Sequence, residues 1–362
     1  MAFIKTDYIR VGSYTKKLGE YPALQAQLWD RLRNTRFEEL YSCTDLELSE
    51  ALSLLQVSAY FDFTGLRQPE NIKEAAHYLI QENILVKQDN GRYAITNLGA
   101  VLFAKKLSSF PRISRKAMRI VQYEGSNRMN MIREYIHESG YAVDFEEILR
   151  YISALLPSRE LIQEGLRRKI TAYPDIAIRE AVANALIHQD FSAVGTGPVT
   201  EIFDDRIEIT NAGIPLVDIS CIIDNPPRSR NEKLAELMRR LHICEELGTG
   251  WDKMVISCEY MQLPAPKIAI YADSTRVTLF SSMRYADMPM SDRVWSCYLH
   301  ACIKYIQGEQ MTNQSLRERF GMKKSSSGTA SRLIKETINR KLIKPLDPDT
   351  APRYMKYIPV WA

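Results

Sequence analysis

The sequence predicts an α+β protein built from several domains, and three observations lead to this prediction. The chain has 362 residues, which exceeds the roughly 100 to 200 residues of one typical domain. Helical patterns followed by short strand pairs occur near both ends, whereas residues 113–284 mix helices with strands. Hydrophobic residues at 45% and charged residues at 25% are values of a globular protein. We expect segments at residues 1–36, 37–112, 113–284 and 285–362.

Composition excludes several protein classes. No window approaches the ~20 apolar residues of a membrane span, and Lys5, Asp7 and Arg10 interrupt the start where a signal peptide needs an apolar run. A soluble, cytoplasmic protein without a membrane partner is expected. The six cysteines are scattered and form no Cys-x-x-Cys pair, which predicts reduced core thiols rather than a zinc finger or disulfide framework.

Positive charge is concentrated at the C-terminus. From Tyr285 to Ala362 there are 13 Lys and Arg against 7 Asp and Glu, so the whole-chain net charge of +4 leaves residues 1–284 at −2. This asymmetry favours an anionic partner for the last segment, although ordinary solvated surfaces carry a similar excess.

The first two segments predict the end of one domain followed by a small helical domain with a hairpin. Phe3 to Val11 predicts a strand and Ala23 to Arg33 a helix, which together look like the end of a domain. Residues 37–112 predict helices at Leu46–Leu55 and Pro69–Gln81, followed by two strands around Asp89-Asn90-Gly91. Asn-Gly favours a type I′ hairpin turn, so this segment resembles a winged helix.

A strong helix with a polar face is predicted at Asp175–His188. At 100° per residue, Glu180, Asn184 and His188 fall within an arc of about 80°, opposite an apolar side. Asn and His are weak helix formers, so their presence points to a requirement beyond helix stability. A plain solvated face remains the alternative.

Two glycine-containing turns follow this helix. Val199–Phe203 and Arg206–Thr210 predict adjacent strands, and Asn211-Ala212-Gly213 ends the second, although a plain loop would explain that turn. After a predicted helix at Asn231–Leu241, Gly248-Thr249-Gly250 stands directly before another helical run, from Trp251 to Met261. Glycines at a helix start expose backbone N–H groups beside the positive end of the helix dipole, as a phosphate site requires.

The order of these elements resembles the ATP-binding fold of DNA gyrase, MutL and sensor histidine kinases (the GHKL type, an α/β sandwich). More closely, the stretches REAVANALIHQDFS, FDDRIEITNAGIP and SRNEKLAELMRRLHICEELGTGWDKM resemble bacterial RecG-like or AlbA-type transcriptional regulators. In that family a Schlafen AlbA-like domain precedes the ATPase-like domain and ends in a phrase similar to DYIRVGSYT. The resemblance therefore implies that nearly all of the AlbA-like domain is absent here.

The resemblance also implies roles for individual residues. Asn184 corresponds to the asparagine that holds Mg²⁺ against the triphosphate of ATP, and Glu180 to the carboxylate that activates the attacking water. Hydrolysis needs such a base and metal close to the γ-phosphate. His188 could contact a phosphate, but a structural role is more common for such a histidine. Further nucleotide contacts are expected from Asn211, Gly213, Arg228, Arg230, Gly248, Thr249 and Gly250.

One position departs from the broader pattern. ATPases of this fold place aspartate at the first glycine turn, where its carboxylate accepts the adenine amine, whereas this chain has Asn211. A neutral amide carbonyl is a weaker acceptor. The resemblance also implies a lid between the two glycine turns, from Ile214 to Leu247. Its two arginines, Arg228 and Arg230, could clamp phosphates or remain solvated.

The last segment predicts a second winged helix. Helices are expected at Val294–Gln307, Thr312–Phe320 and Ser325–Arg340, with strands at Leu342–Leu346 and Tyr354–Val360. The third helix would read double-stranded DNA, and its candidate contact residues are Lys323, Lys324, Ser325, Ser326, Thr329, Arg332 and Lys335. A protein-contact module is the alternative.

Together these features predict a DNA-associated regulator in which ATP binding, with slow hydrolysis at most, modulates DNA binding. A homodimer is implied only by analogy with the wider fold and with helix-turn-helix proteins. Two alternatives stay open. One is a repressor with a degenerate ATP pocket, and the other is a subunit of a phage-defence or DNA-processing complex.

Overall fold

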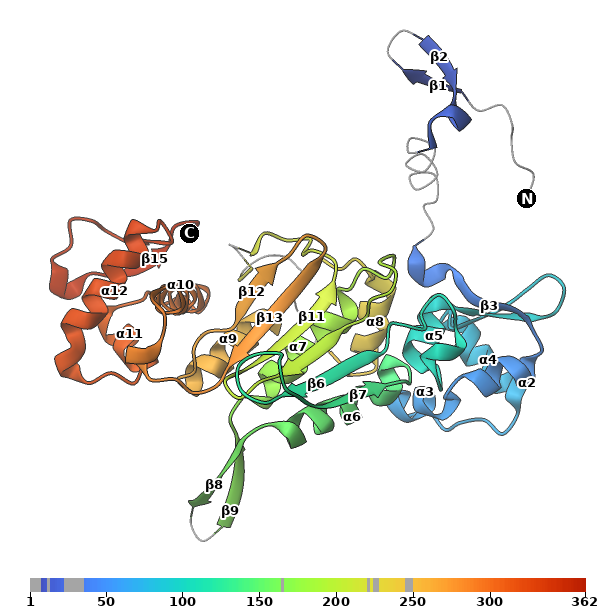
Figure 1. Ribbon diagram of the computed structural model, residues 1–362, viewed down its shortest axis with the longest axis horizontal. Coiled ribbons are helices and arrows are strands. Elements are labelled where there is room, and N and C mark those ends of the chain that lie inside the picture. The colour runs from blue at the N-terminus through green and yellow to red at the C-terminus, as the bar shows by residue number, and fades with distance from the viewer. Residues whose placement is uncertain are drawn as a thin grey trace.

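The computed structural model contains both helices and sheets, in agreement with the predicted α+β class (Figure 1). It describes residues 8–11, 14–22, 36–163, 166–219, 222–223, 228–244 and 250–362. Strands β1 (Tyr8–Val11) and β2 (Tyr14–Lys17) form an antiparallel hairpin. The helix predicted at 23–33 lies outside the described residues.

An N-terminal region of short helices and three strands follows. Its antiparallel sheet has the strand order β3-β5-β4, so the strand that precedes the helices pairs with the hairpin that follows them. The two predicted helices and the hairpin are present, while β3, α3 and α5 were not predicted. The bounds are β3 (Tyr41–Leu46), α2 (Leu48–Leu54), α3 (Val57–Thr64), α4 (Ile72–Gln81), β4 (Leu85–Lys87), β5 (Tyr93–Thr96) and α5 (Asn97–Phe103).

The turn of the β4–β5 hairpin differs from the expected type. A type I′ turn needs positive φ at both central residues, but only Gly91 is left-handed, with φ 80°. The Gly91 N–H donates to the Gln88 carbonyl at 2.9 Å, and the Gln88 N–H donates to the Arg92 carbonyl at 2.8 Å. The Asn90 side chain accepts the Arg92 N–H at 3.0 Å, which stabilises a three-residue loop. The type I′ prediction was therefore wrong, although the hairpin itself was right.

The central region is a six-stranded mixed sheet with the order β12-β13-β11-β10-β6-β7. Only the β6–β10 pair is parallel. Its strands are β6 (Met118–Tyr123), β7 (Met131–His137), β10 (Val199–Ile202), β11 (Arg206–Ala212), β12 (Lys267–Ile270) and β13 (Ser274–Phe280). Its helices are α6 (Tyr141–Leu155), α7 (Asp175–Ile187), α8 (Glu232–Arg240) and α9 (Gly250–Tyr260), and β8 (Ser158–Gln163) pairs with β9 (Leu166–Thr171) in a separate hairpin.

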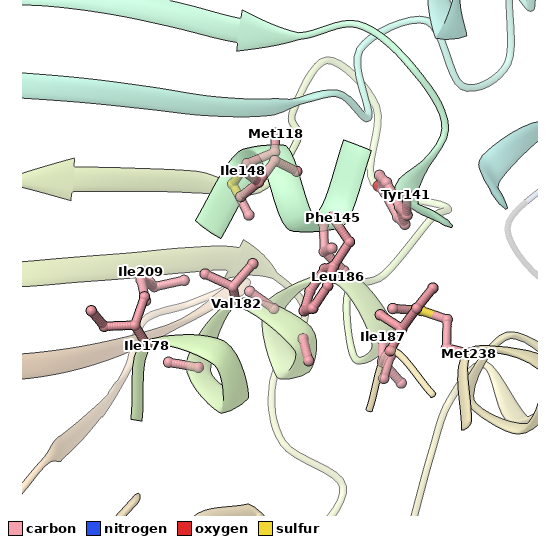
Figure 2. Close-up of a cluster of buried hydrophobic side chains, with 14 of the residues drawn as sticks. Met118, Tyr141, Phe145, Ile148, Ile178, Val182, Leu186, Ile187, Ile209 and Met238 are labelled. Atoms are coloured by element: carbon pink, nitrogen blue, oxygen red, sulfur yellow. The ribbon is translucent and has the colours of Figure 1, made fainter. Parts of the chain in front are cut away.

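Period-2 alternation gives the two faces of this sheet different chemistry. On one face, buried apolar side chains of β6 and β11 pack against α6 and α7; Figure 2 shows Met118 and Ile209 next to Ile148, Val182 and Leu186. The other face is polar: Arg128 binds both Glu201 and Glu208 across neighbouring strands at 2.5–2.7 Å. The helices therefore cover one face only, and the candidate site lies on that side.

The C-terminal region consists of three helices and a two-stranded hairpin. Its elements are α10 (Met290–Ile306), α11 (Asn313–Arg319), α12 (Ser327–Asn339), β14 (Ile343–Pro345) and β15 (Tyr357–Pro359). Leu333 and Ile334 are buried, as expected for the inward side of the third helix. That helix begins at Ser327 rather than Ser325, because Lys324–Ser326 form a turn of 3-10 helix.

Two properties of the whole described chain bear on the composition arguments. Within the described residues, no helix is both long and apolar enough to cross a membrane. The five cysteines in the described part are not joined in disulfides, and Cys258, Cys297 and Cys302 are buried. Burial raises the pKa of Cys258 and of Cys297 to about 12, so both remain protonated at neutral pH.

Candidate functional site

Helix α7 is largely buried, although Asp175, Ile176 and the capping residue His188 are exposed. Ile178, Val182 and Leu186 lie in the core between α6 and the sheet. Glu180 on the other side is only 5% exposed, and Asn184 is half-buried. The solvated-face alternative is therefore wrong for Glu180, since this carboxylate has been removed from water.

Glu180 and Asn184 face the start of α9. A Cβ atom added to Gly250 would lie 2.3 Å from Glu180 Oε2 and 3.8 Å from Asn184 Nδ2. Only glycine leaves room for this approach, which brings both side chains to the positive end of the α9 dipole. Of the predicted second glycine turn, Gly248 and Thr249 lie outside the described residues.

The environment of Glu180 alters its acidity. Burial raises the pKa of the carboxyl group, and the cations of Lys253 and Arg179 lower it in part. A carboxylate whose pKa is raised toward neutrality is a better proton acceptor at physiological pH than an exposed one. Its position and acidity fit a general base.

The end of β11 forms the second part of the site. The Asn211 amide donates from Nδ2 to the Ala212 carbonyl at 3.0 Å, so its Oδ1 is the atom that can accept from a ligand. Gly213 is left-handed, with φ 100°, and a Cβ there would lie 3.1 Å from the Asp190 nitrogen. The left-handed backbone and the close approach of Asp190 both favour glycine at this position.

Asp190 is a site residue that the sequence analysis missed. Its N–H donates to the Ala212 carbonyl at 2.8 Å, and its Oδ2 accepts from Arg230 Nη1 at 2.9 Å. Burial opposes ionisation of Asp190, but hydrogen bonds from Ser192 and the nearby cations of Arg230 and Lys116 outweigh it and lower the pKa. The sequence carried one signal for Asp190. An aspartate that directly follows a helix and stands two residues before a serine is typical of a turn in which the aspartate side chain binds the backbone.

The two lid arginines differ in their surroundings. Arg230 is held by Asp190 and donates from Nη2 to the Ile214 carbonyl at 3.1 Å. Arg228 is exposed. The structure therefore brings Arg230 to the first glycine turn, whereas it leaves Arg228 at the surface.

His188 caps the C-terminus of α7, and its N–H donates to the Asn184 carbonyl at 2.9 Å. Protein atoms around the ring lower the pKa of His188 and the Arg230 guanidinium lowers it further, although part of the side chain reaches solvent. The imidazole is therefore neutral at physiological pH and brings no positive charge to a phosphate.

A separate hollow of about 650 Å³ lies between α6 and α7. It shares only Glu180 with the predicted nucleotide residues, and its other lining residues are Glu146, Leu149, Arg150, Ser153, Ala154, Asp175, Ile176, Ile178 and Arg179. Its walls do not include Asn184 or Gly213. The hollow therefore meets the predicted nucleotide residues at Glu180 alone.

Metal binding at this site would depend on the ligand. Within the described ranges, no group of three or more His, Cys, Asp or Glu side chains is arranged to hold a metal ion. Mg²⁺ commonly binds through one or two protein oxygens together with substrate phosphates and water. Asn184 fits such a minimal role.

The residues predicted to contact DNA lie together at the C-terminal region. Lys323, Lys324, Ser325, Arg332 and Lys335 are exposed, while Ser326 and Thr329 are half-buried. Arg332 Nη2 donates to the Thr329 hydroxyl at 3.2 Å, which orients the guanidinium along α12.

Comparison with protein families locates a known domain type within the central region. Residues 195–279 match the family model "Putative ATP-dependent DNA helicase recG C-terminal". The match identifies an ATPase-like domain. It spans the two glycine turns and the lid, but not α7, which carries Glu180 and Asn184.

Comparison with known structures and proteins adds information on the fold alone. The crystal structure of the DIP2311 protein from Corynebacterium diphtheriae is similar, with a TM-score of 0.57 and 15% sequence identity; the alignment covers 97% of this chain and 69% of that chain. The similarity therefore extends over the terminal regions as well as the central sheet. The comparison with curated proteins gave no match.

Proposed function

We propose that this protein binds Mg-ATP between α7, the end of β11 and the start of α9, and that nucleotide binding modulates DNA binding by the C-terminal region. The main support is the packing of Glu180 and Asn184 against Gly250 in an ATPase-like domain. A helix N-terminus, a buried carboxylate and an amide then converge where a triphosphate and its metal would be bound.

Each residue has a distinct part in this proposal. Asn184 would hold Mg²⁺, which neutralises charge on the phosphates, and Asn211 Oδ1 would accept the adenine amine. Glu180 would take a proton from the attacking water, because burial raises its pKa. Arg230 would exchange its contact with Asp190 for a phosphate oxygen, which gives the lid two alternative positions.

We also propose that both terminal regions are winged helices and that the C-terminal one binds double-stranded DNA; three helices followed by a hairpin in the C-terminal region support this. Helix α9 offers a path between the two sites. Its first residue, Gly250, lies against Glu180, and near its end Glu259 binds His300 of α10 at 2.6 Å. A shift of α9 on nucleotide binding would therefore be transmitted to the DNA-binding region.

Nucleotide binding is tested by thermal unfolding with Mg²⁺ and ATP, ADP or GTP. A ligand at about 100 times its Kd stabilises the fold by about 2.7 kcal/mol, so the wild type should unfold at a higher temperature with Mg-ATP. Asn184→Ala should abolish this shift without loss of fold, whereas Asn339→Ala, at the exposed end of α12, should retain it. No shift in the wild type would indicate a degenerate pocket.

Hydrolysis is tested separately by phosphate release with and without DNA. Glu180→Gln should bind nucleotide and lose turnover, because an amide cannot accept the proton. If wild type binds ATP but releases no phosphate, a binding-only domain remains.

A further inference from the structure

Strand β7 forms one edge of the central sheet and has an unusual surface. In the described part of the chain it pairs with β6 alone, so its outer backbone groups face no other strand. All its residues except His137 are exposed. Four of them are large and apolar: Met131, Ile132, Tyr135 and Ile136 are each 46–58% exposed.

Because side chains alternate along a strand, these four residues occupy both faces of the sheet edge. Ile136 lies on the polar face, and Tyr135 lies on the face of α6, where it contacts Tyr151. An irregularity in the pairing with β6 shifts Met131 to a position opposite Tyr123, so that Met131 also lies on the polar face, with Ile132 at the irregularity. An exposed edge that is apolar on both faces is a template for pairing with another strand.

The opposite edge of the same sheet is protected. Strand β12 is four residues long, follows Pro264 and Pro266, and begins with Lys267. Proline, lysine and short length are the usual devices that block pairing at an edge. Strand β7 is seven residues long and contains neither proline nor lysine, and its one register irregularity lies near its start, which leaves Arg133–His137 regular. Head-to-tail pairing of β7 with β12 of another copy is thus disfavoured.

We propose that β7 pairs antiparallel with β7 of a second copy of this chain, joining the two central sheets through a two-fold axis at Glu134. A two-fold axis perpendicular to the sheet leaves each side chain on the face that it already occupies. Directly opposed residues of an antiparallel pair point to the same face, so the axis must pass beside a residue that faces its own copy. This dimer surface is independent of the proposed nucleotide site.

The register centred on Glu134 matches the side chains. It places Arg133 opposite Tyr135 of the partner, and it brings Ile132, at the irregularity of β7, beside Ile136 of the partner, each contact occurring twice. Only Glu134 meets its own copy, and each Glu134 keeps Arg119 of β6 as an ion-pair partner at 3.3 Å. Centring on Arg133 would instead oppose two arginines and place Ile132 against Glu134, which costs free energy.

The first test is sedimentation of the full chain over a range of concentrations. A dimer that dissociates on dilution is expected for the wild type, because one strand pair buries less surface than an obligate interface. Ile132→Lys with Ile136→Lys should give a monomer at every concentration. Ile270→Lys, at the equally exposed edge of β12, is the matched control and should dimerise like wild type. A wild type that is monomeric throughout, or a control that also loses the dimer, would overturn the proposal.

The second test fixes the register by cysteine crosslinking. Glu134→Cys should form a covalent dimer under mild oxidation, because residues facing each other across the axis have Cα atoms about 4.5–5.5 Å apart. Arg133→Cys should crosslink no more than wild type, whose own thiols supply the background. Crosslinking at Arg133 instead of Glu134 would refute this register, and crosslinking at neither would refute the strand pairing. Sedimentation and crosslinking do not depend on ATP binding, so a failure of the proposed nucleotide site would leave both results unchanged.

Discussion

The N-terminal and C-terminal regions have similar elements but opposite charge. Each contains three helices followed by a two-stranded hairpin. Residues 37–112 carry 7 Lys and Arg against 10 Asp and Glu, whereas residues 285–362 carry 13 against 7. An acidic surface repels the phosphate backbone, so a shared architecture does not imply a shared partner.

The two regions are also attached to the central domain in different ways. The N-terminal region uses Glu38, whose buried carboxylate accepts the Lys233 and Leu234 N–H groups at the start of α8, and an exposed ion pair between Glu82 and Arg240. The C-terminal region uses a buried cluster in which Glu259 contacts His300 and Arg319. We infer that the first region is a structural support and the second a binding module.

The largest effect is expected at the C-terminal attachment. Arg319 is 4% exposed, so Glu259→Gln leaves a buried cation without its counter-charge and should lower the free energy of unfolding by about 3–5 kcal/mol. Arg240→Gln, which breaks the exposed pair of the N-terminal region, should cost at most about 1 kcal/mol. Urea unfolding of the full chain measures both. Equal losses would contradict the difference in attachment.

DNA binding should depend on the C-terminal charges only. Replacing Lys323 and Lys324 with Ala should make the log-log salt dependence of affinity shallower by up to about 1.8, since each phosphate that a lysine neutralises contributes about 0.9 to the slope. Replacing the exposed Lys73 and Lys87 of the N-terminal region should leave the slope unchanged. Fluorescence anisotropy with duplex DNA at several salt concentrations gives these slopes, and an unchanged slope in the first variant would favour the protein-contact alternative.

A smaller and more local effect is expected for Arg332. If its guanidinium reads a guanine edge, Arg332→Ala should cost about 1–3 kcal/mol at one base position and relax the preference there. Binding to a panel of single-base variants of a selected site measures this loss. A uniform loss over all sequences would show instead that Arg332 contacts phosphate.

The smallest effect concerns pH and the N-terminal attachment. Burial raises the pKa of Glu38 above its ordinary value of 4.5, and the Leu234 and Lys233 N–H groups offset this only in part. A raised folded-state pKa means that folding takes up protons, so the contribution of Glu38 is greatest below pH 4.5 and decreases as pH rises through the folded-state pKa.

The unfolding free energy of wild type relative to Glu38→Gln should therefore fall as pH rises from about 4 to 7. Urea unfolding at several pH values measures this difference. A difference that increased with pH would mean that the backbone N–H groups outweigh burial and lower the Glu38 pKa.

Local pattern was sufficient for some of the helices and adjacent strand pairs, although α3 and α5 were not predicted. The periodicity around Glu180 and Asn184 located α7 to within one residue, and β10 with β11 were found because neighbouring strands joined by a short turn leave a local signal. The exposed face of α12 was also predicted. Its start was misplaced by two residues, because serines near a helix end support several turn geometries.

Tertiary structure alone decided the rest. Strand β7 has apolar side chains on both faces, so no alternation marks it as a strand at the edge of a sheet. Asp190 becomes a site residue only because Arg230, 40 positions later, returns to bind it. Gly250 is required because of Glu180 on a different helix. In each case the deciding neighbour is distant in sequence, and a single sequence records residue types but not which of them meet in space.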